Sequence, residues 1–110
     1  MKQDDRTDLI ECILNALQGK VCRIVQYGHS TKVQDTVRQS FDISVFTPYR
    51  INVDEEERLS NAVFQFNRNH SCKVSVIDLP ERTFLEKVDS TPFYQKMERE
   101  GVLLWQPPEN

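Results

Sequence analysis

A single acidic residue, Asp42, lies in a segment whose pattern could support metal-assisted chemistry. The segment SFDISVF (40–46) alternates apolar and polar residues, as a strand with one buried face does. Its apolar face would carry Phe41, Ile43 and Val45, and its polar face Ser40, Asp42 and Ser44. Carboxylates at alternate strand positions point to one side, where they can hold Mg²⁺ beside a nucleotide triphosphate. The segment therefore offers one carboxylate where such chemistry uses two or three.

A second alternating segment, KVSVIDL (73–79), could supply another ligand to the same site. Its functional face would be either Lys73, Ser75 and Ile77 or Val74, Val76 and Asp78. Asp78 lies three residues after Ser75, and an odd separation puts two strand residues on opposite faces. Asp78 is therefore a poor substitute for an acid at position 75.

Gly28 follows a short apolar run, VCRIVQY (21–27), which is typical of a buried strand. The residues after it are polar, with Val33 and Val37 four apart, a spacing that predicts a short helix over 30–38. A glycine turn that leads into a helix offers backbone N–H groups to phosphate oxygens. We therefore expect Gly28, His29 and Ser30 to form an anion-binding turn near Asp42, in which His29 could also act as a general base.

The remaining elements follow from periodicity and from helix breakers. A first helix has Leu9, Ile13 and Leu17 on one face and Gly19 as its stop. Another begins with a capping box, Asn52–Glu55 or Asp54–Glu57, and continues through Phe66. Pro80 closes the strand 73–79, a further helix starts at ERTFLEKV, restarts at Thr91–Pro92 and ends at Gly101, and VLLW (102–105) is a last strand. The order α-β-α-β-α-β-α-β predicts an α+β (α/β) fold, a small mixed sheet of about four strands packed with about four helices.

The composition is that of one small globular domain. The chain has 110 residues, 38% hydrophobic and 28% charged, with a net charge of -3, which argues against a general nucleic-acid surface. The N-terminus lacks an apolar signal segment, and no apolar run approaches the roughly 20 residues that span a bilayer. The three cysteines, Cys12, Cys22 and Cys72, are widely spaced and favour small buried residues over a disulfide or zinc site. We expect one domain over 1–106, a polar tail over 107–110 and a cytoplasmic location.

Three segments, taken in order, resemble the minimal nucleotidyltransferase (MNT) family. They are 27–46, 73–79 and TPFYQKMEREGVLLW (91–105), so the resemblance, taken from its first to its last segment, spans most of the chain. That family has a glycine–serine turn, a helix, a strand with Asp-x-Asp and a third Asp on a later strand. Its chains often close with a short helix, a glutamate–glycine pair and an apolar strand. The resemblance implies a nucleotidyltransferase-like fold.

Carried over residue by residue, the resemblance implies a site that has lost two of three acids. Gly28 matches the glycine of the turn, and His29 stands in place of the serine. Asp42 matches the second acid of Asp-x-Asp, with Ser40 at the first; a shift of two residues would make Asp42 the first and Ser44 the missing second. Ser75 stands where the third acid is expected, so Asp42 is the one vestigial catalytic and metal-binding residue in either alignment.

One carboxylate with neutral serines cannot organise a two-metal site. The resemblance therefore implies a catalytically degenerate protein that needs no cofactor and binds a protein partner. It would be the antitoxin-like member of a pair with a HEPN-type helical toxin. Two alternatives stay open: an active Mg²⁺-dependent transferase that moves a nucleotide from ATP to a protein or small-molecule acceptor, and a module that binds nucleotide without chemistry. The formation of a homo-oligomer is also left open.

Basic and aromatic residues give further candidates. Arg23, Lys32 and Arg38 could line a phosphate pocket, or each could lie on a solvated face. Phe64 and Phe66 are two apart on a predicted helix and cannot both face the core, so one of them could mark a partner surface.

Overall fold

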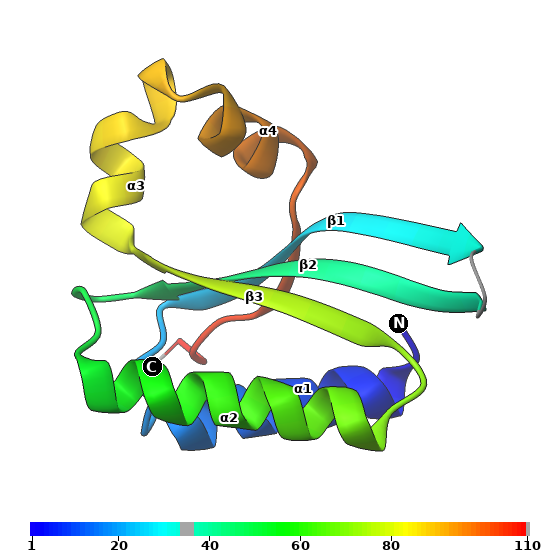
Figure 1. Ribbon diagram of the computed structural model, residues 1–110. Coiled ribbons are helices and arrows are strands. Elements are labelled where there is room, and N and C mark those ends of the chain that lie inside the picture. Colours follow the sequence, from blue (N-terminus) through cyan, green and yellow to red (C-terminus); the bar gives the residue numbers. More distant parts are fainter. Residues whose placement is uncertain (34–36, 110) are drawn as a thin grey trace.

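Strands with apolar residues at alternate positions form a mixed sheet that carries helices on both faces (Figure 1). The computed structural model describes residues 1–33 and 37–109. In chain order the elements are α1 (Gln3–Ala16), β1 (Arg23–Val33), β2 (Val37–Thr47), α2 (Val53–Asn69), β3 (Lys73–Pro80), α3 (Glu81–Lys87), a short 3₁₀ turn (Val88–Ser90), α4 (Pro92–Glu100) and β4 (Val102–Trp105). The predicted α+β class, a mixed sheet of four strands with four α-helices among the described residues, is confirmed.

The strand order across the sheet is β3-β2-β1-β4. β1 is antiparallel to both β2 and β4, whereas β2 and β3 are parallel. The parallel pair needs a crossover connection, and α2 provides it. β3 and β4 are therefore the two edges of the sheet.

The helix predicted over 30–38 is wrong, and with it the strict alternation of helices and strands. Residues 30–33 and 37–38 are extended and belong to a hairpin that pairs Ser30 with Ser40 and Val33 with Val37. The intervening residues 34–36 lie outside the described residues. The four-residue spacing of the valines fits a helix, but β-branched residues also suit strands, and the hairpin ladder satisfies the backbone groups.

Two apolar clusters hold the helices to the sheet. Below the sheet in Figure 1, α1 and α2 pack on a cluster that includes Leu9, Ile13, Ile43 and Val74, all nearly inaccessible to solvent. Above it, the residues 81–100, which we call the helical lobe, pack on a second cluster: Val25, Phe46, Leu79, Phe84, Val88 and Met97. The polar face of β2 therefore lies on the side of the helical lobe.

The predicted breakers act largely as expected. The chain leaves α1 through Gln18 and Gly19, both with positive φ (54° and 78°), and the Gly19 N–H donates to the Leu14 carbonyl. Pro92 is in the first turn of α4, and Gly101 follows its last residue. Thr91, however, makes no capping hydrogen bond with its side chain. Of the two alternatives for α2, the Asn52–Glu55 capping box is the one that forms.

Glu55 is a buried carboxylate whose charge stabilises the start of α2. Its Oε1 accepts from the Asn52 N–H at 3.0 Å, and its Oε2 lies 3.5 Å from Lys20 Nζ. The backbone hydrogen bond from Asn52, followed by the charge of Lys20, lowers the pKa of Glu55 against the opposing effect of burial.

This lowered pKa gives a pH prediction. A carboxyl whose pKa is lower in the folded than in the unfolded state stabilises the fold above its ordinary pKa of about 4.3, and this stabilisation is lost as the pH falls through the lower folded value. We expect the urea midpoint of the wild type to fall between pH 5 and pH 3 (roughly the range around that pKa) more than that of Glu55→Gln. Circular dichroism at each pH measures it, with the exposed Glu56→Gln as matched control; equal slopes for wild type and Glu55→Gln would contradict the assignment.

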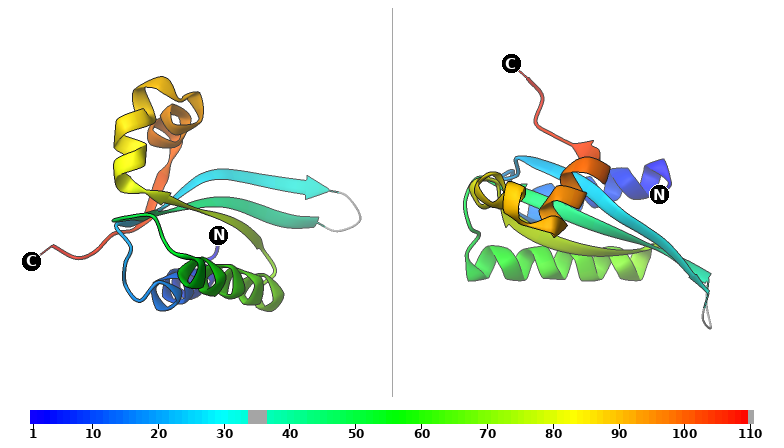
Figure 2. Two further views of the ribbon diagram at one scale, coloured as in Figure 1. Left: turned by 60° about the vertical axis from the view of Figure 1, so that its left-hand side comes forward. Right: turned by 90° about the horizontal axis from the view of Figure 1, so that it is seen from above.

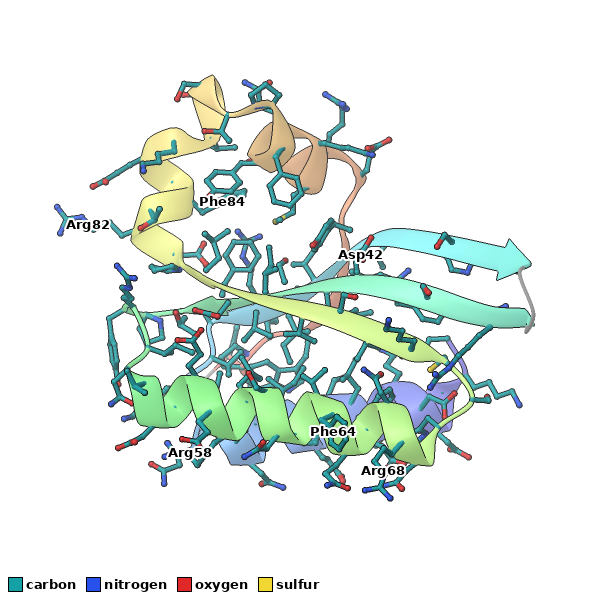
Figure 3. All side chains as sticks on the ribbon, in the orientation of Figure 1. Asp42, Arg58, Phe64, Arg68, Arg82 and Phe84 are labelled. Carbon is teal, nitrogen blue, oxygen red and sulfur yellow. The ribbon has the colours of Figure 1, made fainter. Side chains whose placement is uncertain are left out.

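The two phenylalanines of α2 separate as expected. Phe66 is buried at 4% exposure, whereas Phe64 is 60% exposed and projects from α2 away from the sheet (Figure 3).

Cys72 is buried, and Cys12 and Cys22 are half-buried. In the described part of the chain, no helix combines the length and apolar character that crossing a bilayer requires.

Candidate functional site

Asp42 lies at the centre of the sheet, on the face that carries the helical lobe (Figure 3). The strand pairing places Gly28 of β1 on one side of it and Ser75 of β3 on the other. Three of the residues singled out in the sequence are therefore neighbours across three adjacent strands.

Gly28 is not part of a turn, which corrects the predicted anion-binding site. β1 runs straight through it to Val33, so no helix begins beside Asp42 to offer free N–H groups. The backbone of Gly28 is not left-handed; what matters is its missing side chain, because a Cβ there would collide with Asp42 Oδ2. The pairing of β1 with β2 shifts between Gln26 and Gly28, an irregularity of the kind often found near functional sites. Gly28 thus makes room for the carboxylate rather than for a phosphate.

An open cleft of about 420 Å³ lies beside this pair. Asp42, Lys96 and Glu100 are its charged side chains. Its other lining residues are Gln26, Tyr27, Gly28, His29, Ser30 and Val102. Sequence reasoning did not assign Lys96 and Glu100 to the site, although their i, i+4 spacing on α4 shows that they share a helix face.

His29 and Ser30 follow Gly28 on β1 and line the same cleft as Asp42. The His29 ring stacks on Phe41, with 4.7 Å between ring centroids and 6° between the planes. Phe41 belongs to the cluster under α1 and α2, so the His29 ring points to the face opposite Asp42. Ser30 is exposed and pairs with Ser40 further out on the hairpin. Ser30 is two residues from Gly28 and so lies on the face of β1 that borders Asp42, whereas the His29 ring turns away from it.

The serines at the expected acid positions lie in different environments. Ser75 is exposed and directly opposite Asp42 on β3, while Ser40 lies two residues from Asp42 along β2. Ser44 is completely buried and donates to the Val25 carbonyl at 3.5 Å. Ser44 is therefore part of the core beneath the helical lobe, not of the open cleft.

Asp78 lies on the other face of β3 from Ser75. Its alternate neighbours Val74 and Val76 pack toward α1 and α2, whereas Ile77 and Leu79 pack toward the helical lobe. Strand alternation therefore keeps the Asp78 carboxylate away from Asp42.

Two of the basic candidates are engaged elsewhere. Arg38 donates to the carbonyls of Asn67, Ser71, His70 and Cys72, where α2 ends and β3 begins. Arg23 pairs with Glu81 at 3.2 Å and lies 3.9 Å from the centre of the Phe46 ring. These guanidinium groups stabilise the fold and do not line the Asp42 cleft.

The residues of the cleft do not fit the two-metal site of an active nucleotidyltransferase. Such a site needs several carboxylates around ions roughly 3.5–4 Å apart, and in the described residues no group of three or more His, Cys, Asp or Glu side chains is arranged to hold a metal. Asp42 still affects its surroundings: burial and then the charge of Asp42 raise the pKa of Tyr27. With two carboxylates against Lys96, the cleft carries more negative than positive charge and would repel a triphosphate that brings no cation.

Comparisons with known proteins agree with this fold. No protein-family model matches the sequence, and no curated protein matches it. A chain from tri-AMPylated Shewanella oneidensis HEPN toxin in complex with MNT antitoxin is similar in structure, with a TM-score of 0.60 and 14% identity over 97% of this chain and 74% of that chain. A chain from a mutant of the toxin–antitoxin MntA–HpeT has a TM-score of 0.58 and 14% identity over 93% and 73%.

A further crystal structure from Shewanella oneidensis has a TM-score of 0.57 and 12% identity, over 97% of this chain and 74% of that chain. At these identities the similarity shows the fold. The chain therefore has the nucleotidyltransferase-like fold of the minimal nucleotidyltransferase proteins.

Proposed function

We propose that the chain is an MNT-type protein that acts by binding a HEPN-type partner and does not itself transfer nucleotides. The observation that carries this proposal is the surroundings of Asp42. Its partners across the sheet are Gly28 and Ser75, neither of which can ligate a metal as a carboxylate does.

Loss of the phosphate-binding turn supports the same conclusion. In the resembled family a glycine–serine turn precedes a helix, whereas here β1 and β2 continue as one hairpin through the described residues 28–33 and 37–42. In the described residues this extended pairing therefore puts a strand where a helix N-terminus would present its N–H groups to a phosphate. The fold is retained while both the metal-binding and the phosphate-binding parts of the site are depleted.

The partner class comes from the structural neighbours. Two of them are chains of toxin–antitoxin complexes, one of which names a HEPN toxin with an MNT antitoxin. We infer the antitoxin-like role for this chain from that fold similarity together with its depleted site. Inhibition by contact needs a stable surface, and not a functional set of acids.

A test combines binding and transfer in one sample. The chain is co-expressed with the product of its neighbouring gene, and the complex is measured by size-exclusion chromatography with light scattering and then incubated with labelled ATP and Mn²⁺. We expect a stable complex and no label on either protein. Asp42→Ala should leave the complex intact, within about 0.5 kcal/mol of binding free energy, as substitutions away from an interface do. Absence of a complex, or a label that disappears with Asp42→Ala, would contradict the proposal.

Glu100 gives one reason to retain transfer as a second candidate. It lines the same cleft as Asp42, and Mg²⁺ is often held by one or two carboxylates together with substrate phosphates. If the labelled-ATP sample does show transfer, its loss in both Asp42→Ala and Glu100→Gln would assign the activity to this pair.

A further inference from the structure

The outer edge of β4 could pair with a further strand. β4 is the last strand in the order, so in the described part of the chain its outer backbone edge pairs with no other strand. Its sequence, VLLW, contains no charged residue, and Val102 and Leu103 are 56% and 44% exposed. Edge strands are usually protected by charges, prolines or a covering element, and an apolar edge is a template for another strand.

An open groove of about 560 Å³ lies over the first turns of α1 and reaches β4 at Leu104. In the view from above, α1 lies beside β4 (Figure 2). Met1, Ile10 and Leu104 line the groove with apolar surface, and Arg6 is its one charged lining residue among those described. The groove therefore brings together three apolar side chains, one of them from the edge strand, and one guanidinium in a largely polar lining.

Arg6 is positioned at the edge and has spare donors. Its guanidinium donates to the Leu104 carbonyl of β4 at 2.9 Å. A guanidinium has five N–H donors, and within residues 1–33 and 37–109 Arg6 forms no ion pair with a carboxylate. It can keep the bond to β4 and still receive a carboxylate through two parallel hydrogen bonds.

We propose that an extended segment of the protein partner adds to the outer edge of β4 as a fifth strand and places an acidic side chain on Arg6. The inference rests on the proposed function, which supplies a protein partner, and goes beyond it by naming the surface and the chemistry of the bound segment. Main-chain hydrogen bonds to β4 would give affinity, and Arg6 would select for negative charge. Because Val102 and Leu103 are partly exposed, the added strand would also cover apolar surface beside β4.

The groove beside β4 and the Asp42 cleft differ in their net charge. The cleft has two carboxylates and one lysine, so an acidic segment is disfavoured there. The groove beside β4 has Arg6 alone, so the same segment is favoured at β4. The proposal thus predicts which of the two openings the partner occupies.

The experiment measures the purified complex with the neighbouring gene product by calorimetry. Arg6→Glu should weaken binding by about tenfold or more, since a bidentate charge pair becomes a repulsion, and Arg6→Lys should weaken it less. The control is Arg82→Glu, which makes the same charge change on the exposed side of α3 (Figure 3) and should stay within about twofold. Leu103→Lys, which is independent of Arg6 and does not line the Asp42 cleft, should also weaken binding by about tenfold, because it places a solvated charge on the apolar edge strand. Thermal unfolding of each free variant shows that it is folded.

Hydrogen–deuterium exchange of the same complex tests strand addition directly. Amides of residues 102–105 should exchange more slowly in the complex than in the free chain, because an added strand accepts their free hydrogen bonds. A complex in which Arg6→Glu and Leu103→Lys bind like the wild type, or in which only α1 or the Asp42 cleft is protected, would overturn this inference and leave the proposed function standing. If the wild type forms no complex at all, the proposed function fails and this inference fails with it.

Discussion

Replacing Phe46 by alanine should lower the free energy of unfolding by about 3–5 kcal/mol. Phe46 is completely buried between the sheet and the helical lobe, and its ring meets Phe84 edge to face with centroids 5.0 Å apart. The Arg23 guanidinium stacks on the same ring and pairs with Glu81 at the start of α3, so truncation leaves a cavity and also loosens that ion pair. Small domains are stable by only about 5–15 kcal/mol, so the loss is a large share of the total. Urea unfolding followed by circular dichroism measures it.

Phe64→Ala is the matched control for this substitution. It removes the same atoms from a side chain that is 60% exposed, and should change stability by less than about 0.5 kcal/mol. If the two variants lose similar stability, the helical lobe is not held to the sheet through Phe46. The consequence extends to the site, because Lys96 and Glu100 reach the Asp42 cleft from α4 of the same lobe.

Ser75→Asp should convert the chain into one whose stability depends on divalent metal. The introduced carboxylate would lie directly opposite Asp42 on the neighbouring parallel strand. Like charges in such positions repel, so without metal we expect a loss of about 0.2–1 kcal/mol. Mn²⁺ at about 100 times its dissociation constant would add roughly 2.7 kcal/mol, which for a domain of this size is a rise of about 10 °C in the unfolding temperature. Differential scanning fluorimetry with and without Mn²⁺ measures both effects.

Two variants make this result specific. Ser75→Asn has a similar size without the charge, and should show neither the loss nor the rise. Val76→Asp adds a carboxylate at the next residue of β3, which faces the opposite side of the sheet. Mn²⁺ should therefore not raise the unfolding temperature of this variant. A wild-type chain that is itself stabilised by Mn²⁺, with the effect abolished by Asp42→Ala, would show that the existing ligands suffice.

Periodicity predicted most of the elements because each has one buried side. The alternation over 40–46 and the spacing along α2 correspond to the faces that pack on the two apolar clusters. The prediction of a helix over 30–38 is wrong because this part of the hairpin lies at the end of the sheet. There each strand has a partner on one side only, so the burial of its side chains does not alternate regularly. Ser30, Thr31 and Gln39 are all exposed there. In such a segment the pairing of backbone groups decides the structure, and single-residue spacing does not reveal it.

The sequence predicted which face of a single strand each site residue occupies. It did not predict which residues from different elements come together at the site. Alternation alone placed Asp78 on the face opposite Ser75, as the packing of its neighbours shows. It could not show that Ser44 is buried, because that depends on the helical lobe folding over the end of β2. Nor could it bring Lys96 and Glu100 to Asp42, which lies more than fifty residues earlier in the chain. The stacking of His29 on Phe41 likewise depends on how two strands are paired.

The contacts of Arg38 and Asn67 make the position of β3 insensitive to changes in the loop before it. Arg38 of β2 donates hydrogen bonds to backbone carbonyls between residues 67 and 72. The Asn67 side chain both donates to and accepts from the Val74 backbone. An extra residue inserted between α2 and β3 would thus be pushed outward as a bulging loop, since sliding the strand by one place would break these bonds and turn its apolar side chains to solvent. The orientation of residue 75 toward Asp42 therefore depends on the side chains of Arg38 and Asn67. Serine and an acidic residue can replace each other at position 75 without a change in the register of β3.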